Sequence, residues 1–234
     1  MKAAPLAAPV RGDARDDAKV SAALKRLPKH SFLSIAEAEA VGRDIARRLL
    51  CKGVNPDLVV GIANGALLMT RVVSEELGRP LEIVNVRRKG SRIKNRLLRV
   101  KQALRVPYVT HGPMRLFWRA FERAFYKCWP TQLEAESNEL QFDVRGKNVL
   151  LVDDCIATGT SVRFVHSQLL AGGARTVTVG AICLSDDSPL RPGEPGFPAV
   201  YINRLSQFYP WSANHPDHEQ YLRWLAAHNL KQWE

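Results

Sequence analysis

The chain has 234 residues and a formal net charge of +11, and a chain of this length can bury one sizeable hydrophobic core. The positive charge favours a polyanionic partner, whether nucleic acid, an acidic membrane surface or a highly phosphorylated substrate. The four cysteines show no paired spacing that would indicate a disulfide framework or a zinc site, and no stretch approaches the ~20 apolar residues of a membrane-spanning helix.

Residues 1–30 are rich in Ala, Pro and alternating charge. They predict a mobile N-terminal arm with one short helix around residues 18–27, which ends at Pro28. Pro5, Pro9 and Arg11 interrupt any apolar signal-peptide core, so we expect a reduced, cytoplasmic protein.

Residues 31–90 predict two helices and two strands. Ser34 and Glu37 form a capping-box pattern at the start of a helix that reaches Gly53. An apolar run over residues 58–63 predicts a buried strand, and residues 64–66 turn into a helix that ends at Gly78. Residues 80–86 predict a further strand.

Residues 90–140 form an insert with a basic first half and an aromatic second half. Phe117, Phe121, Phe125 and Trp129 recur every four residues with basic residues between them, which predicts a helix with one aromatic and one basic face. Packing of the aromatic face against the core is the first interpretation. A partner or an anionic membrane surface is the alternative, and nucleic acid is not favoured because no matching binding module is present.

The second half of the chain again alternates strands and helices. Strands are predicted over residues 149–152 and 176–184, with a helix over residues 161–171 between them, then an edge strand over 199–203 and a helix over 217–228. This alternation predicts an α/β fold with a doubly wound, mostly parallel sheet.

Two adjacent carboxylates, Asp153 and Asp154, follow the buried strand at residues 149–152. Ligands bind at the carboxyl ends of strands in such sheets, and two carboxylates can accept hydrogen bonds from a vicinal diol or face a hydrated Mg²⁺ ion. The next loop supplies small residues and hydroxyls at a helix N-terminus, which suits a phosphate; it consists of Ala157, Thr158, Gly159, Thr160 and Ser161.

A simpler interpretation is that the acids end a strand and the hydroxyls cap a helix. It accounts for the hydroxyls but not for two neighbouring acids, and receiver domains, which also pair acids after a strand, lack the Thr-Gly-Thr-Ser loop. The whole run resembles the PRPP-binding signature of type I phosphoribosyltransferases, and the resemblance extends from about Phe32 to Leu184. It implies that family's fold, with Asp153 and Asp154 as catalytic residues that hold the ribose hydroxyls and, through water, Mg²⁺, and residues 157–161 as the site of the 5-phosphate.

The resemblance also implies a diphosphate site. Asn64 and Gly65 lie where the family has its diphosphate loop, and Arg88 or Lys89 is the basic residue expected near that group. A segment within residues 90–140 would be the loop that closes over the site.

The acceptor is less defined. Many 6-oxopurine enzymes of the family carry an acid where this chain has Ala157, so a hypoxanthine or guanine assignment is weakened. Tyr209 and Trp211, in a small C-terminal hood over residues 199–234, are candidates to stack on a base, although packing against the C-terminal helix explains them equally well. His215 and His218 lack further ligands, so we expect surface histidines rather than a metal site.

These features predict one phosphoribosyltransferase domain over residues 31–234, acting with PRPP and a small-molecule acceptor and forming a homo-oligomer. A nucleobase acceptor, with a purine slightly favoured, is the first hypothesis. The same transfer to a sugar or glycan, and a non-catalytic PRPP-sensing regulator that binds RNA, are the alternatives.

Overall fold

The computed structural model of the protein describes residues 13–28, 31–88, 133–135, 140–205 and 207–232. The chain divides into two compact units. The first comprises Met1–Asn85 and Glu139–Glu234, and the second comprises Val86–Asn138.

A parallel sheet forms the centre of the first unit, as the sequence predicts. Its strands run in the order β2-β1-β4-β5-β6, and each neighbouring pair is parallel. The bounds are Leu58–Ala63 for β1, Leu81–Arg88 for β2, Asn148–Ile156 for β4, Thr176–Leu184 for β5 and Val200–Asn203 for β6. The doubly wound α/β fold is confirmed, and β6 is the predicted edge strand.

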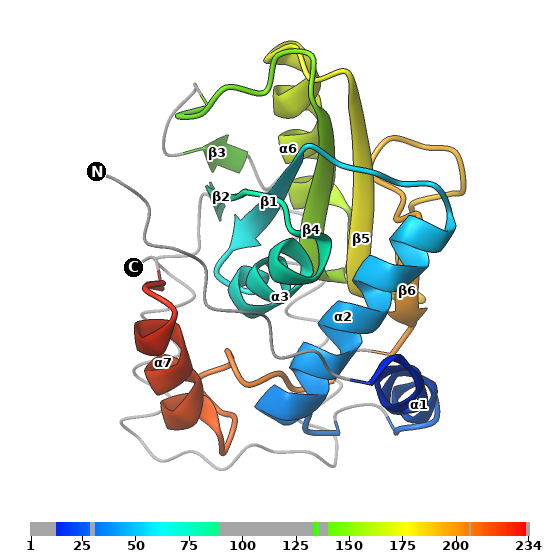
Figure 1. The fold of residues 1–234 in the computed structure, drawn as a ribbon, viewed down its shortest axis with the longest axis vertical. Helices are drawn as coiled ribbons and strands as arrows, with labels where there is room; N and C mark the ends of the chain where they lie inside the picture. The colour runs from blue at the N-terminus through cyan, green and yellow to red at the C-terminus, as the bar shows by residue number, and fades with distance from the viewer. Residues whose placement is uncertain (1–12, 29–30, 89–132, 136–139, 206, 233–234) are drawn as a thin grey trace, which may run out of the picture. The chain divides into compact units, whose positions relative to one another are not determined.

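Helices cover both faces of this sheet (Figure 1). Helices α2 (Ile35–Cys51) and α3 (Leu67–Leu77) lie on one face, and α6 (Thr160–Ala171) lies on the other. Apolar side chains of α2, α3 and the central strands form one continuous core, which Tyr221 and Leu225 of α7 (His218–Ala227) also join. Because both faces are covered, the central strands β1 and β4 are almost uninterrupted apolar runs.

Local signals set several element ends where the sequence predicts them. Ser34 Oγ accepts a hydrogen bond from the Glu37 N–H, and the Glu37 carboxylate accepts one from the Ser34 N–H, so the capping box is present. Gly78 ends α3 in the left-handed conformation, which glycine adopts without steric penalty.

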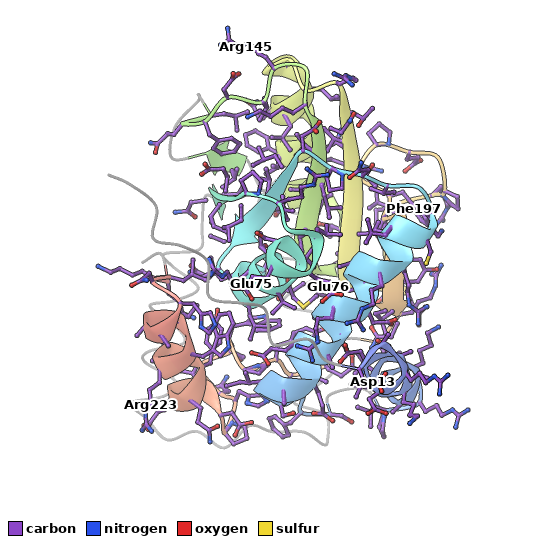
Figure 2. All side chains as sticks on the ribbon, viewed as in Figure 1. Asp13, Glu75, Glu76, Arg145, Phe197 and Arg223 are labelled. Carbon is purple, nitrogen blue, oxygen red and sulfur yellow. The ribbon has the colours of Figure 1, made fainter. Side chains whose placement is uncertain are left out.

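The N-terminal segment contains the predicted short helix, which begins and ends a few residues earlier than expected. Residues Ala14–Leu24 form helix α1, which packs beside α2. Asp17 of α1 accepts hydrogen bonds from Arg43 and Arg47 of α2, and Arg47 also bonds to Glu76 of α3, which Figure 2 labels. A buried acid with two arginine partners therefore anchors this helix, and composition alone cannot reveal such a long-range contact. Residues 1–12 and 29–30 lie outside the described part of the chain.

The second unit is described only at its ends. Residues Val86–Arg88 of β2 pair antiparallel with β3 (Leu133–Ala135). The predicted basic and aromatic helix of the insert lies outside the described residues. Among the described helices, none combines the length and the apolar character that crossing a bilayer requires.

Candidate active site

The acidic pair lies inside strand β4 rather than after it. The pairing of β4 with β1 ends at Gly61 and Val152, whereas its pairing with β5 continues to Ile156 and Leu184. The last four residues of β4 therefore extend past the paired part of β1, which leaves space for the loop that follows β1.

That loop brings Gly65 against Asp154. A Cβ added to Gly65 would lie only 2.6 Å from Asp154 Cγ, closer than real Cβ atoms approach. Only glycine therefore fits beside this carboxylate without moving it. The peptide bond that precedes Asn64 is cis. Two candidate regions far apart in the sequence, the 64–65 loop and the acidic pair, are thus neighbours.

Asp153 is a buried carboxyl group, with 8% of its surface exposed. Burial raises the pKa of Asp153 well above its usual range, and the neighbouring Asp154 carboxylate raises it further. Within the described residues, no lysine or arginine forms an ion pair with either acid. Two close carboxylates without a cation of their own suit a positively charged group supplied by a ligand.

The loop after β4 exposes hydroxyls at the start of α6. Ala157, Thr158 and Thr160 are exposed, and the two threonine hydroxyls lie 2.8 Å apart. Gly159, the N-cap residue, has φ of +73° and lies so close to Leu190 that a side chain would collide with it. Since glycine cannot cap the helix with a side chain, an anion can take that role at the positive helix end.

Trp211 reaches the acidic pair from the C-terminal segment. Its indole N–H donates a hydrogen bond to Asp154 Oδ2 at 2.6 Å. The sequence offers no signal for this contact, because 57 residues separate the two partners. The hydrogen bond from Trp211 to the acidic pair was therefore not predicted.

Tyr209 lies beneath Trp211 rather than at the surface. Its ring stacks on that of Trp211, with centroids 4.8 Å apart and planes 13° apart, and it is 6% exposed. Burial raises the pKa of Tyr209 well above its usual range. Tyr209 therefore belongs to the hydrophobic core, whereas Trp211 is half-buried and lies near Tyr221 of α7.

The remaining candidate residues are the basic residues at the end of β2 and the two histidines of the C-terminal segment. Arg88 belongs to the second unit, where its backbone pairs with Leu133, and Lys89 lies outside the described residues. His215 is buried rather than at the surface, and burial lowers its pKa. His218 lies close to the Pro210 carbonyl. In the described ranges, no three His, Cys, Asp or Glu side chains gather in a way that could hold a metal ion.

This donor set fits Mg²⁺ bound through water and substrate oxygens. Mg²⁺ keeps several waters and binds through one or two carboxylates together with substrate phosphates. Asp153 and Asp154 provide two carboxylates, and their mutual repulsion disappears when a cation neutralises them. The two carboxylates are too few for a metal ion whose ligands all come from the protein.

Comparison with known proteins identifies the family. The family described as phosphoribosyl transferase domain matches residues 30–201. The chain belongs to this family. The match covers strands β1 to β5, the acidic pair and the loop at residues 157–161, and it ends inside β6, before Tyr209 and Trp211.

Individual relatives of the family are distant. The chain is 27% identical over 144 residues to the amidophosphoribosyltransferase of Staphylococcus aureus (strain Mu50 / ATCC 700699); the match spans 62% of this chain but only 23% of that relative. The fold resembles a purine phosphoribosyltransferase from Pyrococcus horikoshii, with a TM-score of 0.53, 17% identity, and coverage of 78% of this chain and 94% of that one.

A third similar structure is a hypothetical protein from Neisseria gonorrhoeae with bound ppGpp. It has a TM-score of 0.54 at 17% identity, and the match covers 86% of this chain and 99% of that one. At these identities both structures establish a shared fold, that of type I phosphoribosyltransferases, and leave the acceptor open.

Proposed function

We propose that the protein transfers the 5-phosphoribosyl group of PRPP to a small acceptor and releases diphosphate. The observation that carries this proposal is the contact between the 64–65 loop and Asp154, beside an exposed hydroxyl loop at the start of α6. The family match covers all three parts of this arrangement.

Each part of PRPP has a suitable partner. The backbone and hydroxyls at residues 157–161 would bind the 5-phosphate, because the N-terminus of α6 favours negative charge. Asp154 would accept hydrogen bonds from the 2- and 3-hydroxyls of ribose, with Asp153 beside it. Asn64 and Gly65 would approach the diphosphate with their backbone.

The reaction is a displacement at the anomeric carbon of ribose. The bond to diphosphate breaks as positive charge develops on the sugar, and the acceptor attacks from the opposite face. The protein contributes mainly by orienting both reactants and by placing carboxylates near the developing positive charge. Bound through Asp153 and Asp154, Mg²⁺ would supply charge to stabilise the leaving diphosphate.

For the acceptor we propose a nucleobase. Trp211 is half-buried beside Asp154, so a flat ring near the anomeric carbon could contact its indole, and aromatic surfaces favour stacking. Tyr209 would support Trp211 from beneath rather than touch the base. Because Ala157 provides no acid for proton transfer, acceptors that need such an acid are less well served.

The direct test incubates the protein with PRPP, Mg²⁺ and a panel of nucleobases while diphosphate release is measured. Base-dependent release that stops when a chelator removes Mg²⁺ is the expected result. Release only with a sugar acceptor would replace the nucleobase proposal. Tight PRPP binding without turnover, together with salt-sensitive RNA binding, would show a regulator instead.

A further inference from the structure

The Asp154 carboxylate is held from three directions. Its Oδ1 accepts a hydrogen bond from the Cys155 N–H at 2.7 Å, and its Oδ2 accepts the Trp211 indole N–H at 2.6 Å. Gly65 closes the third side. A side chain with two rotatable bonds is thereby limited to one orientation.

The indole that makes this bond is itself fixed. One ring face of Trp211 stacks on Tyr209, which is buried in the core, and its centroid lies 6.1 Å from that of Tyr221 in α7. Since Tyr209 and Tyr221 are both buried, the direction of the Trp211 N–H is determined by the packing of the C-terminal segment. The bond therefore makes the orientation of Asp154 in strand β4 depend on the position of the C-terminal segment.

A count of lone pairs indicates what the bond leaves open. An ionised carboxylate has about four acceptor sites. Two of those of Asp154 are taken by Cys155 and Trp211, and the neighbouring Asp153 side chain also lies within hydrogen-bonding reach of Asp154. The acceptor sites that remain suit hydroxyl donors, such as the 2- and 3-hydroxyls of ribose.

We propose that Trp211 is a positioning residue for the sugar site: its indole N–H orients Asp154 so that the remaining acceptor sites of the carboxylate face the ribose hydroxyls. This inference rests on the proposed function. It assigns to the C-terminal segment, which lies beyond the family match, a role in binding PRPP. The role is independent of any contact between Trp211 and the acceptor.

The chain contains a matched control for this bond. Trp224 of α7 donates its indole N–H to Glu39 Oε1 of α2 at 2.7 Å, close to the 2.6 Å of the bond from Trp211 to Asp154. Trp224 also stacks on His228. Replacing either tryptophan with phenylalanine removes one indole–carboxylate bond and keeps an aromatic ring, but only one of the two bonds reaches the acidic pair.

The first measurement is the affinity for PRPP with Mg²⁺, by calorimetry. Trp211→Phe is expected to weaken binding about tenfold, while Trp224→Phe is expected to leave it within about twofold of the wild type. Equal affinity of the wild type and Trp211→Phe would overturn the inference and leave the proposed function intact. A wild type that binds no PRPP would overturn the proposed function, and the inference with it.

The second measurement needs neither PRPP nor turnover. The indole N–H signals of the five tryptophans are recorded by NMR on ¹⁵N-labelled protein, and the signal missing in Trp211→Phe is assigned to Trp211. In Asp154→Asn this signal is expected to move upfield, because a bond to a neutral amide oxygen is weaker than one to a carboxylate. The Trp224 signal should not move. An unshifted Trp211 signal would refute the bond, whatever the affinity of Trp211→Phe for PRPP.

Discussion

Asp17 and Asp153 are both buried carboxyl groups, with 4% and 8% of their surface exposed, yet their surroundings are opposite. Arg43 and Arg47 donate three hydrogen bonds to Asp17 at 2.8–3.0 Å. Asp153 has another carboxylate, Asp154, as its charged neighbour, and burial raises its pKa.

The difference distinguishes an acid that the protein itself pairs from one for which we propose a role in binding ligand. A buried charge is tolerated when it is paired and hydrogen-bonded, so the protein itself completes the environment of Asp17. Among the described residues, no lysine or arginine forms an ion pair with Asp153, and burial next to Asp154 raises its pKa. Strongly shifted carboxyl groups of this kind gather at functional sites.

The largest expected effect is on the structural acid. Asp17→Asn should lower the free energy of unfolding by about 3 kcal/mol, because it leaves two arginines without their buried partner. Chemical denaturation would measure this loss. Affinity for PRPP should be unchanged under conditions in which the variant is folded; a parallel loss of affinity would show that α1 contributes to the site.

Asp154→Asn should have the opposite effect to Asp17→Asn, because it should lower the affinity for PRPP rather than the stability. Loss of hydrogen bonds to a charged group should weaken PRPP binding by about 1.5–3 kcal/mol, or about ten- to a hundredfold, with little change in stability. Calorimetry with PRPP and Mg²⁺ measures the affinity. The control is Asp187→Asn, at an exposed position, and equal binding by both variants would remove Asp154 from the ribose site.

Gly65→Ala tests the contact between the β1 loop and the acids. The added methyl group would collide with the Asp154 carboxylate, so PRPP affinity should fall about tenfold, which is about 1.4 kcal/mol. Gly78→Ala serves as the control, because a Cβ at Gly78 meets no atom within 4 Å and only the left-handed backbone is penalised. If Gly65→Ala binds as well as this control, the loop does not constrain the carboxylate.

Asp153→Asn should change the pH dependence of stability. A carboxyl whose pKa is raised on folding stabilises the native state below its unfolded pKa, near 3.9, and this contribution is lost as pH rises through the higher native pKa. The unliganded variant should therefore show a flatter decline in unfolding free energy above about pH 4 than the wild type, measured by denaturation at several pH values. Asp187→Asn should keep the slope of the wild type, and the same flattening there would contradict the assignment to Asp153.

Much of the fold was predictable because its signals are local. The apolar run at β5, the capping box at Ser34 and the glycine at Gly78 each specify an element from residues close in sequence. Strand β4 was predicted to end four residues too early, because Asp153 and Asp154 are unusual in a strand and only pairing with β5 extends it to Ile156.

The candidate site was predictable in its parts but not in its contacts. The acidic pair, the Thr158–Thr160 loop and Gly65 were all chosen from the sequence, since each type of side chain suits one part of a phosphorylated sugar. Their roles in binding remain predictions. The burial of His215 and the docking of α1 through Asp17 depend on partners far along the chain, and no local pattern marks them.

The sequence by itself determined the family, the alternation of strands and helices, and the chemical character of the acidic and hydroxyl-rich run, because these depend on residue type and short-range order. Only the tertiary structure decided that Gly65 touches Asp154, that Trp211 bonds to the same carboxylate, and that Asp17 pairs with two arginines while Asp153 is buried beside a second carboxylate. Such contacts form when distant segments pack together, and packing depends on the whole core rather than on neighbouring residues.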